Sequence, residues 1–355
     1  MQVSDTLISQ TISNLRFPLM VGVVAIHLGM SNTGFPAADI ISKLFSGLIP
    51  SSCVPLFFLI SGFLFFWKVK DFSLKTYGKK IKNRLRTLVI PYLIWNTFMI
   101  ICYAAVHFFA PTLTSVENEN VLQYSLADWI TAYWNKSGGQ PVSFQLWFLR
   151  NLIVMSFFSP IFFLLSRLPS VLRLMPLPIF VALESRAGYG WCCGVFYFYL
   201  GVLLSEYNTT LRIKGMFGKF IEKRELWGIL ILIWIALVAL CLNNDNSAFL
   251  DMTLRFFGGA CVLFSAMFFT AKLGKVNEFV ENSGYFVYLF HAFPSFVFKK
   301  FSEMFIHPST SSACIIIYFA RIVAMIGISL VFYLMLLKWF PRFTAVITGR
   351  KVLIR

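Results

Sequence analysis

The sequence has few charged residues, and few of those are acidic. Of 355 residues, 13% are charged and 58% are hydrophobic, and the mean hydropathy is +0.75. An ordinary water-soluble domain with this composition would expose large apolar patches, so the composition excludes one. Apolar stretches of roughly 17 to 25 residues, long enough to cross ~30 Å of hydrocarbon, recur along the chain between short polar segments. The sequence therefore predicts an all-α, polytopic integral membrane protein with no separate soluble domain.

The motifs of several common chemistries are also missing. There is no GxxxxGK[ST] for ATP-driven transport and no HExxH for a catalytic metal. The seven cysteines show no CxxC spacing and fall in or beside apolar stretches, which favours a role as small buried packing residues. We expect no metal and no permanently bound cofactor.

Hydropathy predicts about ten transmembrane helices. They cover residues 15–30, 47–67, 87–110, 146–166, 171–183, 188–205, 226–242, 253–271, 284–298 and 311–337. The fifth is short and holds two prolines, but the distribution of charge supports it as a crossing.

Basic residues outnumber acidic ones by 31 to 15, giving a net charge of +16. With ten spans and a cytoplasmic N-terminus, segment 68–86 and its eight Lys or Arg lie inside the cell, as the positive-inside rule requires. Both termini are then cytoplasmic. The net charge reflects topology and contact with anionic membrane lipids, so it does not indicate nucleic acid binding.

Arg16 and His27 stand out in the first apolar stretch. They are eleven positions apart, which places both side chains on one helix face, roughly 16 Å apart along the axis. The predicted spans put all fifteen acidic residues in loops or termini, leaving no membrane carboxylate for Arg16. Its guanidinium either extends to lipid headgroups or awaits an anionic ligand such as the phosphates of a nucleotide cofactor. A neutral His27 can accept a proton from an alcohol, or it can be satisfied by a backbone carbonyl.

Five stretches occur in order between residue 14 and about residue 291. They are "LRFPLMVGVVAIH", "VPLFFLISGFLFF", "RTLVIPYLIW", "LWFLRNLIV" and "SGYFVYLFH". Together they resemble the acyltransferase-3 family of bacterial integral-membrane O-acyltransferases. The resemblance implies a single transmembrane acyltransferase domain over 1–355, multi-pass in the bacterial cytoplasmic (inner) membrane. It also implies transfer of an acyl group, commonly acetyl, from cytoplasmic acyl-CoA to a hydroxyl of a cell-surface glycan or lipid-linked sugar.

The resemblance assigns catalytic roles to Arg16 and His27. For the acyl-CoA phosphates it points to the basic residues before the third span, here Lys82, Arg84 and Arg86. The family's R-x-x-R is not intact in "KKIKNRLRTLVIP", so these residues can equally form an ordinary positive-inside cluster.

Further residues are predicted to bind substrate. In the ninth span, Tyr288, His291 and Ser295 form a polar stripe that indicates either a pocket wall or interhelical hydrogen bonds. Ser61 precedes Gly62, and these two small residues allow a helix or a pantetheine arm to approach closely. Trp147 suits an interfacial anchor or a pocket wall. The predicted substrate-binding residues are Tyr288, His291, Ser61, Trp147, Arg150 and Arg321.

The predicted mechanism is direct transfer, with His27 as general base and Arg16 near the donor. A covalent acyl-enzyme is the mechanistic alternative. The sequence leaves open which group orients His27, with Asp39 or another loop acid among the alternatives. A transporter or flippase for a lipid-linked sugar, which would make no bond, is the competing function.

Overall fold

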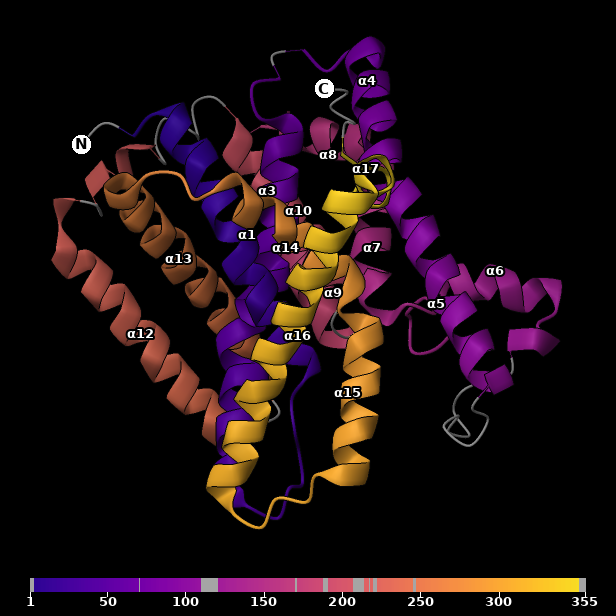
Figure 1. Ribbon diagram of the computed structural model, residues 1–355. Coiled ribbons are helices and arrows are strands. Elements are labelled where there is room, and N and C mark those ends of the chain that lie inside the picture. The colour runs from indigo at the N-terminus through magenta and orange to yellow at the C-terminus, as the bar shows by residue number, and fades with distance from the viewer. Residues whose placement is uncertain are drawn as a thin grey trace.

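The computed structural model describes residues 3–69, 71–109, 121–169, 171–187, 191–206, 214–216, 218–219, 222–244 and 247–350, and these residues form a helical bundle (Figure 1). The α-helices are α1 (Asp5–His27), α2 (Pro36–Ser42), α3 (Cys53–Phe66), α4 (Leu74–Arg84), α5 (Ile90–Phe109), α6 (Leu126–Trp134), α7 (Trp147–Phe157), α8 (Ser159–Ser166), α9 (Pro176–Ala187), α10 (Trp191–Ser205), α12 (Arg224–Asn243), α13 (Ala248–Leu273), α14 (Glu278–Phe290), α15 (Ala292–Phe305), α16 (Ser311–Trp339) and α17 (Pro341–Ile347). Short π or 3-10 turns are η1 (Lys43–Leu48), η2 (Ile49–Ser52), η3 (Leu85–Val89), η5 (Val121–Gln123), η6 (Phe144–Leu146) and η7 (Leu172–Leu174).

Helix α1 lies at the centre of the bundle, in contact with α3, α13, α14 and α16. The Ser4 hydroxyl caps its start by accepting a hydrogen bond from the Leu7 backbone N–H at 3.1 Å. The helix begins ten residues before the predicted span 15–30. Arg16 therefore lies midway along α1 and not at its end, while His27 is its last residue.

Among the described residues, six helices are long and apolar enough to cross a membrane, or seven if α7 and α8 count as one bent span. The six are Asp5–His27, Pro36–Phe66, Leu74–Phe109, Glu225–Asn243, Ala248–Leu273 and Ser311–Trp339. The predicted spans 226–242, 253–271 and 311–337 correspond to α12, α13 and α16. Ten spans are not shown, because 171–183 and 188–205 correspond to shorter apolar helices and 284–298 crosses a break between α14 and α15.

Prolines account for two of the breaks. Pro160 has no N–H to donate to the Ser156 carbonyl, and α7 and α8 meet at an angle of 61°. Pro294 likewise cannot donate to the Phe290 carbonyl, and α14 ends there. His291 follows as the junction residue between α14 and α15. The second break sets the position of a predicted site residue.

One end of the bundle carries the start of α1 together with α4 and α17 (Figure 1). Helix α4 has the sequence LKTYGKKIKNR, which holds four lysines and an arginine. We call this the basic end. The positive-inside rule makes it the cytoplasmic end, which remains a prediction.

Helices α3 and α10 pack backbone to backbone. A Cβ at Gly62 would lie 2.1 Å from the Phe198 carbonyl oxygen, and one at Gly201 would lie 2.1 Å from the Leu59 carbonyl oxygen. Only glycine permits this approach, so the helix-packing interpretation of Gly62 is confirmed. The neighbouring Ser61 lines a cavity instead.

Candidate active site

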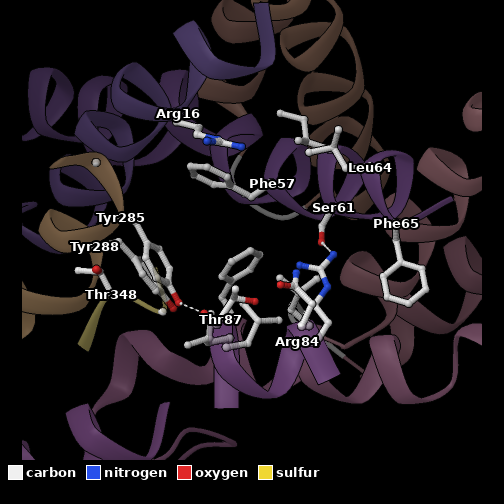
Figure 2. Close-up of a pocket in the computed structure, with 18 of the residues that line it drawn as sticks. Arg16, Phe57, Ser61, Leu64, Phe65, Arg84, Thr87, Tyr285, Tyr288 and Thr348 are labelled. Atoms are coloured by element: carbon white, nitrogen blue, oxygen red, sulfur yellow. Dashed lines mark hydrogen bonds between the residues drawn. The ribbon is translucent and has the colours of Figure 1, made fainter. Parts of the chain in front are cut away.

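A cavity of about 1440 Å³ is bounded by α1, α3, α4, η3, α7, α14 and the residues after α17. Figure 2 shows part of its wall, with Arg16 and Arg84 on opposite sides of the view. Eight of the eleven predicted site residues line it: Arg16, His27, Ser61, Lys82, Arg84, Arg86, Trp147 and Tyr288. Met20 and Val23 line it as well, which confirms that Arg16 and His27 share one face of α1.

Arg16 has a carboxylate partner, contrary to the sequence prediction. Its Nη1 lies 3.0 Å from Oε1 of Glu281 in the first turn of α14. The prediction failed because Glu281 was placed in a loop, whereas the helix includes it. Glu281 also accepts the Ser13 hydroxyl at 2.8 Å and pairs with Lys275 at 3.1 Å. Burial alone would raise the pKa of Glu281, but Ser13, Lys275 and Arg16 together lower it.

The described lining residues are strongly unbalanced in charge. They include one carboxylate, Glu281, and seven cations, which are Arg16, Lys79, Lys80, Lys82, Arg84, Arg86 and Arg350. An anionic ligand is the natural complement to such a surface.

Arg84 is held by neutral partners. Its Nη2 donates to the Ser61 hydroxyl oxygen at 3.1 Å, and its guanidinium lies 5.3 Å from the centre of the Phe65 ring. Lys80 donates to the Phe65 carbonyl beside it. These contacts fix the guanidinium without neutralising it, so its charge remains available to a ligand.

The π-helical turn η3 carries Arg86 and Thr87 into the cavity. Pro91 has no N–H to donate to the Thr87 carbonyl four residues earlier. That carbonyl accepts the Tyr285 hydroxyl at 3.1 Å, drawn as a dashed line in Figure 2. Turns of this kind are frequent at functional sites.

His27 lies about 16 Å from Arg16 along α1. Its ring meets Phe144 edge-on at 4.8 Å and stacks on His291 at 5.3 Å. It is the only histidine among the described lining residues. Asp39, one of the loop acids considered for orienting it, accepts the backbone N–H and the hydroxyl of Thr33 at 3.1 and 3.0 Å. In the described contacts, the rings of Phe144 and His291 orient His27.

The predicted polar stripe of Tyr288, His291 and Ser295 extends across the break between α14 and α15. Tyr288 lines the cavity, and its hydroxyl donates to the Gln145 carbonyl at 2.7 Å. His291 lies behind His27 and not in the lining, and its Nδ1 is 2.8 Å from the Tyr288 carbonyl. Ser295 is 6% exposed and lies outside the lining too. Tyr288 thus fits both interpretations of the stripe, because it lines the cavity and bonds to η6, whereas His291 Nδ1 bonds to carbonyls of α14 itself.

Comparison with known proteins bears on what this cavity does. A family model described as "Acyltransferase domain" matches residues 10–334. The chain belongs to the acyltransferase-3 family. It is also 26% identical over 275 residues to the succinoglycan biosynthesis protein ExoH of Rhizobium meliloti (strain 1021), covering 71% of this chain and 68% of that protein. No solved structure matches the chain.

Two predicted site residues of this acyltransferase-3 protein lie away from the cavity. Arg150 is 3% exposed and donates to the Trp134 carbonyl and to Asn151 Oδ1, the latter at 3.0 Å. Its guanidinium also lies 5.3 Å from the Trp134 ring, which ties α7 to α6. Arg321, on α16, is not part of the lining. The partners that hold Arg150 are neutral groups of α6 and α7.

Sequence reasoning missed several residues of the wall. Glu281 and Tyr285 precede Tyr288 by seven and three positions, so one helix face carries all three, and this spacing was a usable signal. Gln145 and Arg350 also line the cavity, but no local pattern marks either one.

Proposed function

We propose that this protein is a membrane O-acyltransferase that moves an acyl group, with acetyl the first candidate, from acyl-CoA to a glycan or lipid-linked sugar hydroxyl. One observation carries the proposal: Arg16 and His27 line a single cavity, with seven cations among its described lining residues. Membership of the acyltransferase-3 family supports acyl transfer over transport without bond formation.

The cavity suits a long anionic donor. At about 1440 Å³ it exceeds the roughly 300–1,000 Å³ of typical small-molecule pockets, so it has room for parts of two substrates. The CoA phosphates would contact Arg16, Lys82, Arg84 and Arg86, and the pantetheine arm would extend along α1 toward His27. Ser61 and Trp147 would line its path.

His27 would act as general base. Its imidazole takes the proton from the acceptor hydroxyl while the oxygen attacks the thioester carbonyl. The C–S bond then breaks, the ester forms, and the released thiolate recovers the proton as CoA thiol. The hydroxyls of Tyr285 and Tyr288 already donate to backbone carbonyls, which favours His27 as the base. Base assistance of this kind contributes ~10²- to 10⁴-fold.

The acceptor side rests on the relative named for succinoglycan biosynthesis, which supports a polysaccharide or its lipid-linked precursor. The apolar helices support a multi-pass membrane location, for which we propose the bacterial inner membrane. The basic end would then face the cytoplasm, which supplies acyl-CoA.

Surface glycans test this function. A deletion strain is complemented with wild type, His27→Gln or His107→Gln, the last as a matched histidine at the far end of α5. The proposal predicts alkali-labile acyl esters with wild type and His107→Gln and their loss with His27→Gln. Equal ester content in all complemented strains and the deletion strain would refute it.

A further inference from the structure

The residues after α17 form part of the cavity wall. Thr348, Gly349 and Arg350 all line it, and Figure 2 shows Thr348 beyond Tyr285 and Tyr288 on the same side of the view. The family model ends at residue 334, so this segment lies outside the family match. Nothing in the local sequence marked Arg350 as a site residue.

The segment is fixed against η3 and α5. Trp95 Nε1 donates to the Ile347 carbonyl at 3.1 Å. Gly349 has φ +63°, and a Cβ there would lie 2.6 Å from Thr87 Cα and 2.7 Å from the Thr87 carbonyl oxygen. A glycine is required both by the backbone conformation and by this close approach. Arg350 therefore has a defined position next to η3, which carries Arg86.

The Arg350 guanidinium is held by two neutral acceptors. Its Nη1 donates to the Tyr333 hydroxyl oxygen at 2.9 Å and its Nη2 to the Asn282 carbonyl at 2.6 Å. No ion pair joins Arg350 to a carboxylate within the described part of the chain. Glu281 attracts the guanidinium at longer range, but that carboxylate already pairs with Arg16 and Lys275. Positive charge therefore remains in excess beside Arg350, as expected of a phosphate-binding arginine.

We infer that Arg350 is a phosphate-binding residue for the acyl donor, supplied to the cavity by the segment that follows α17. This inference rests on the proposed function, since it takes acyl-CoA as the donor. It deepens that function because the donor site then includes a residue from beyond the family match. Phospholipid headgroups also carry phosphate groups, so the test distinguishes binding of the donor from binding of headgroups.

Donor kinetics provide the main test. Arg350→Gln is compared with Arg342→Gln, which removes the same charge from an exposed position on α17 outside the cavity. We expect a roughly tenfold or larger rise in the KM for acyl-CoA with Arg350→Gln, little change in kcat, and wild-type values with Arg342→Gln. Gly349→Ala, which would displace the segment from Thr87, should raise KM in the same direction.

A phosphate-free donor sharpens the test. With S-acyl pantetheine, wild type and Arg350→Gln should have equal KM, because the contact at issue is absent. A KM difference that persists with this donor would overturn the inference, as would equal KM values for Arg350→Gln and Arg342→Gln with acyl-CoA. If Arg350→Gln lost only the stabilisation that anionic phospholipid vesicles give wild type, with its KM for acyl-CoA unchanged, Arg350 would bind lipid headgroups. That result would also overturn the inference.

Binding of CoA, measured as a shift in thermal midpoint, distinguishes failure of the proposed function from failure of the Arg350 inference. If wild type cleaves no thioester but CoA stabilises wild type and Arg342→Gln more than Arg350→Gln, the proposed function fails and the phosphate site stands. If thioester cleavage occurs but the three proteins bind CoA equally, the inference about Arg350 fails alone.

Discussion

His27 and His291 lie face to face, with ring centroids 5.3 Å apart and planes inclined by 28°. His291 Nδ1 is 2.8 Å from the Tyr288 carbonyl, a geometry in which the nitrogen donates. Pro294 produces the helix break that leaves His291 at the junction of α14 and α15. A fixed ring therefore packs against the proposed base, at a place where the sequence left the orienting group open.

Removing the His291 ring should disturb the position of His27. We expect His291→Ala to lower kcat roughly 10- to 100-fold with little change in the KM for acyl-CoA, because small misplacement of a base is costly. His291→Phe restores a ring face and should recover part of the loss. Steady-state kinetics separate the two parameters, and wild-type kcat for His291→Ala would contradict a positioning role.

The hydrogen bond between Arg84 and Ser61 should matter for the donor. Ser61→Ala removes the acceptor that holds the guanidinium and should raise the KM for acyl-CoA several-fold, since hydrogen bonds to charged groups are worth about 1.5–3 kcal/mol. Ser166→Ala is the control, because Ser166 bonds to the Phe163 carbonyl on α8, outside the cavity. Equal KM values for the two variants would show that Ser61 does not support the donor site.

The lowered pKa of Glu281 predicts a pH-dependent contribution to stability. Its ion pairs persist at and above its ordinary pKa of 4.5 and are lost as pH falls through the lower value of the folded state. Glu281→Gln should therefore have a lower thermal midpoint than wild type at pH 7, and the difference should shrink in acid. Arg16 is 44% exposed, so its pair contributes at most about 1 kcal/mol.

Glu278→Gln provides the matched control for that measurement, because Glu278 is exposed in the same first turn of α14. The control should leave the midpoint near that of wild type. A constant gap between Glu281→Gln and wild type across the acid range would contradict the role given to the ion pairs.

The crossing of α3 and α10 should tolerate no added methyl group. Gly62→Ala would place a Cβ 2.1 Å from a backbone oxygen, and overpacking of this kind costs roughly 1–3 kcal/mol or more. Gly228→Ala on α12 meets no atom within 4 Å and should leave the protein as stable as wild type. The thermal midpoints of the detergent-solubilised proteins report the difference, and equal midpoints would refute the packing account.

The sequence predicted those parts of the fold and site that a single helix encodes. The register of Arg16, Met20, Val23 and His27 follows from the helical period alone, and the cavity confirms it. Helix α6 likewise carries its own start signal, the Ser125 and Asp128 capping box. Strongly apolar stretches such as α12 and α16 were predicted nearly to their ends.

The rest depended on packing between distant segments. Arg16 and Glu281 are 265 positions apart, and hydropathy had placed Glu281 outside the helix that brings them together. Arg150 was predicted to bind substrate, yet it lies between the rings of Trp134 and Trp191 and outside the cavity lining. Arg350 reaches the cavity only because Gly349 fits against Thr87. No local pattern encodes such contacts.

The most direct test of the central claim follows acyl transfer by the purified protein. Detergent-solubilised wild type, His27→Gln and His107→Gln are given acyl-labelled acetyl-CoA and a glycan acceptor, and free CoA thiol and labelled ester are measured together. The account predicts equal amounts of thiol and ester from wild type and His107→Gln, and at least ~10²-fold slower transfer by His27→Gln. Transfer by His27→Gln at the wild-type rate would contradict it.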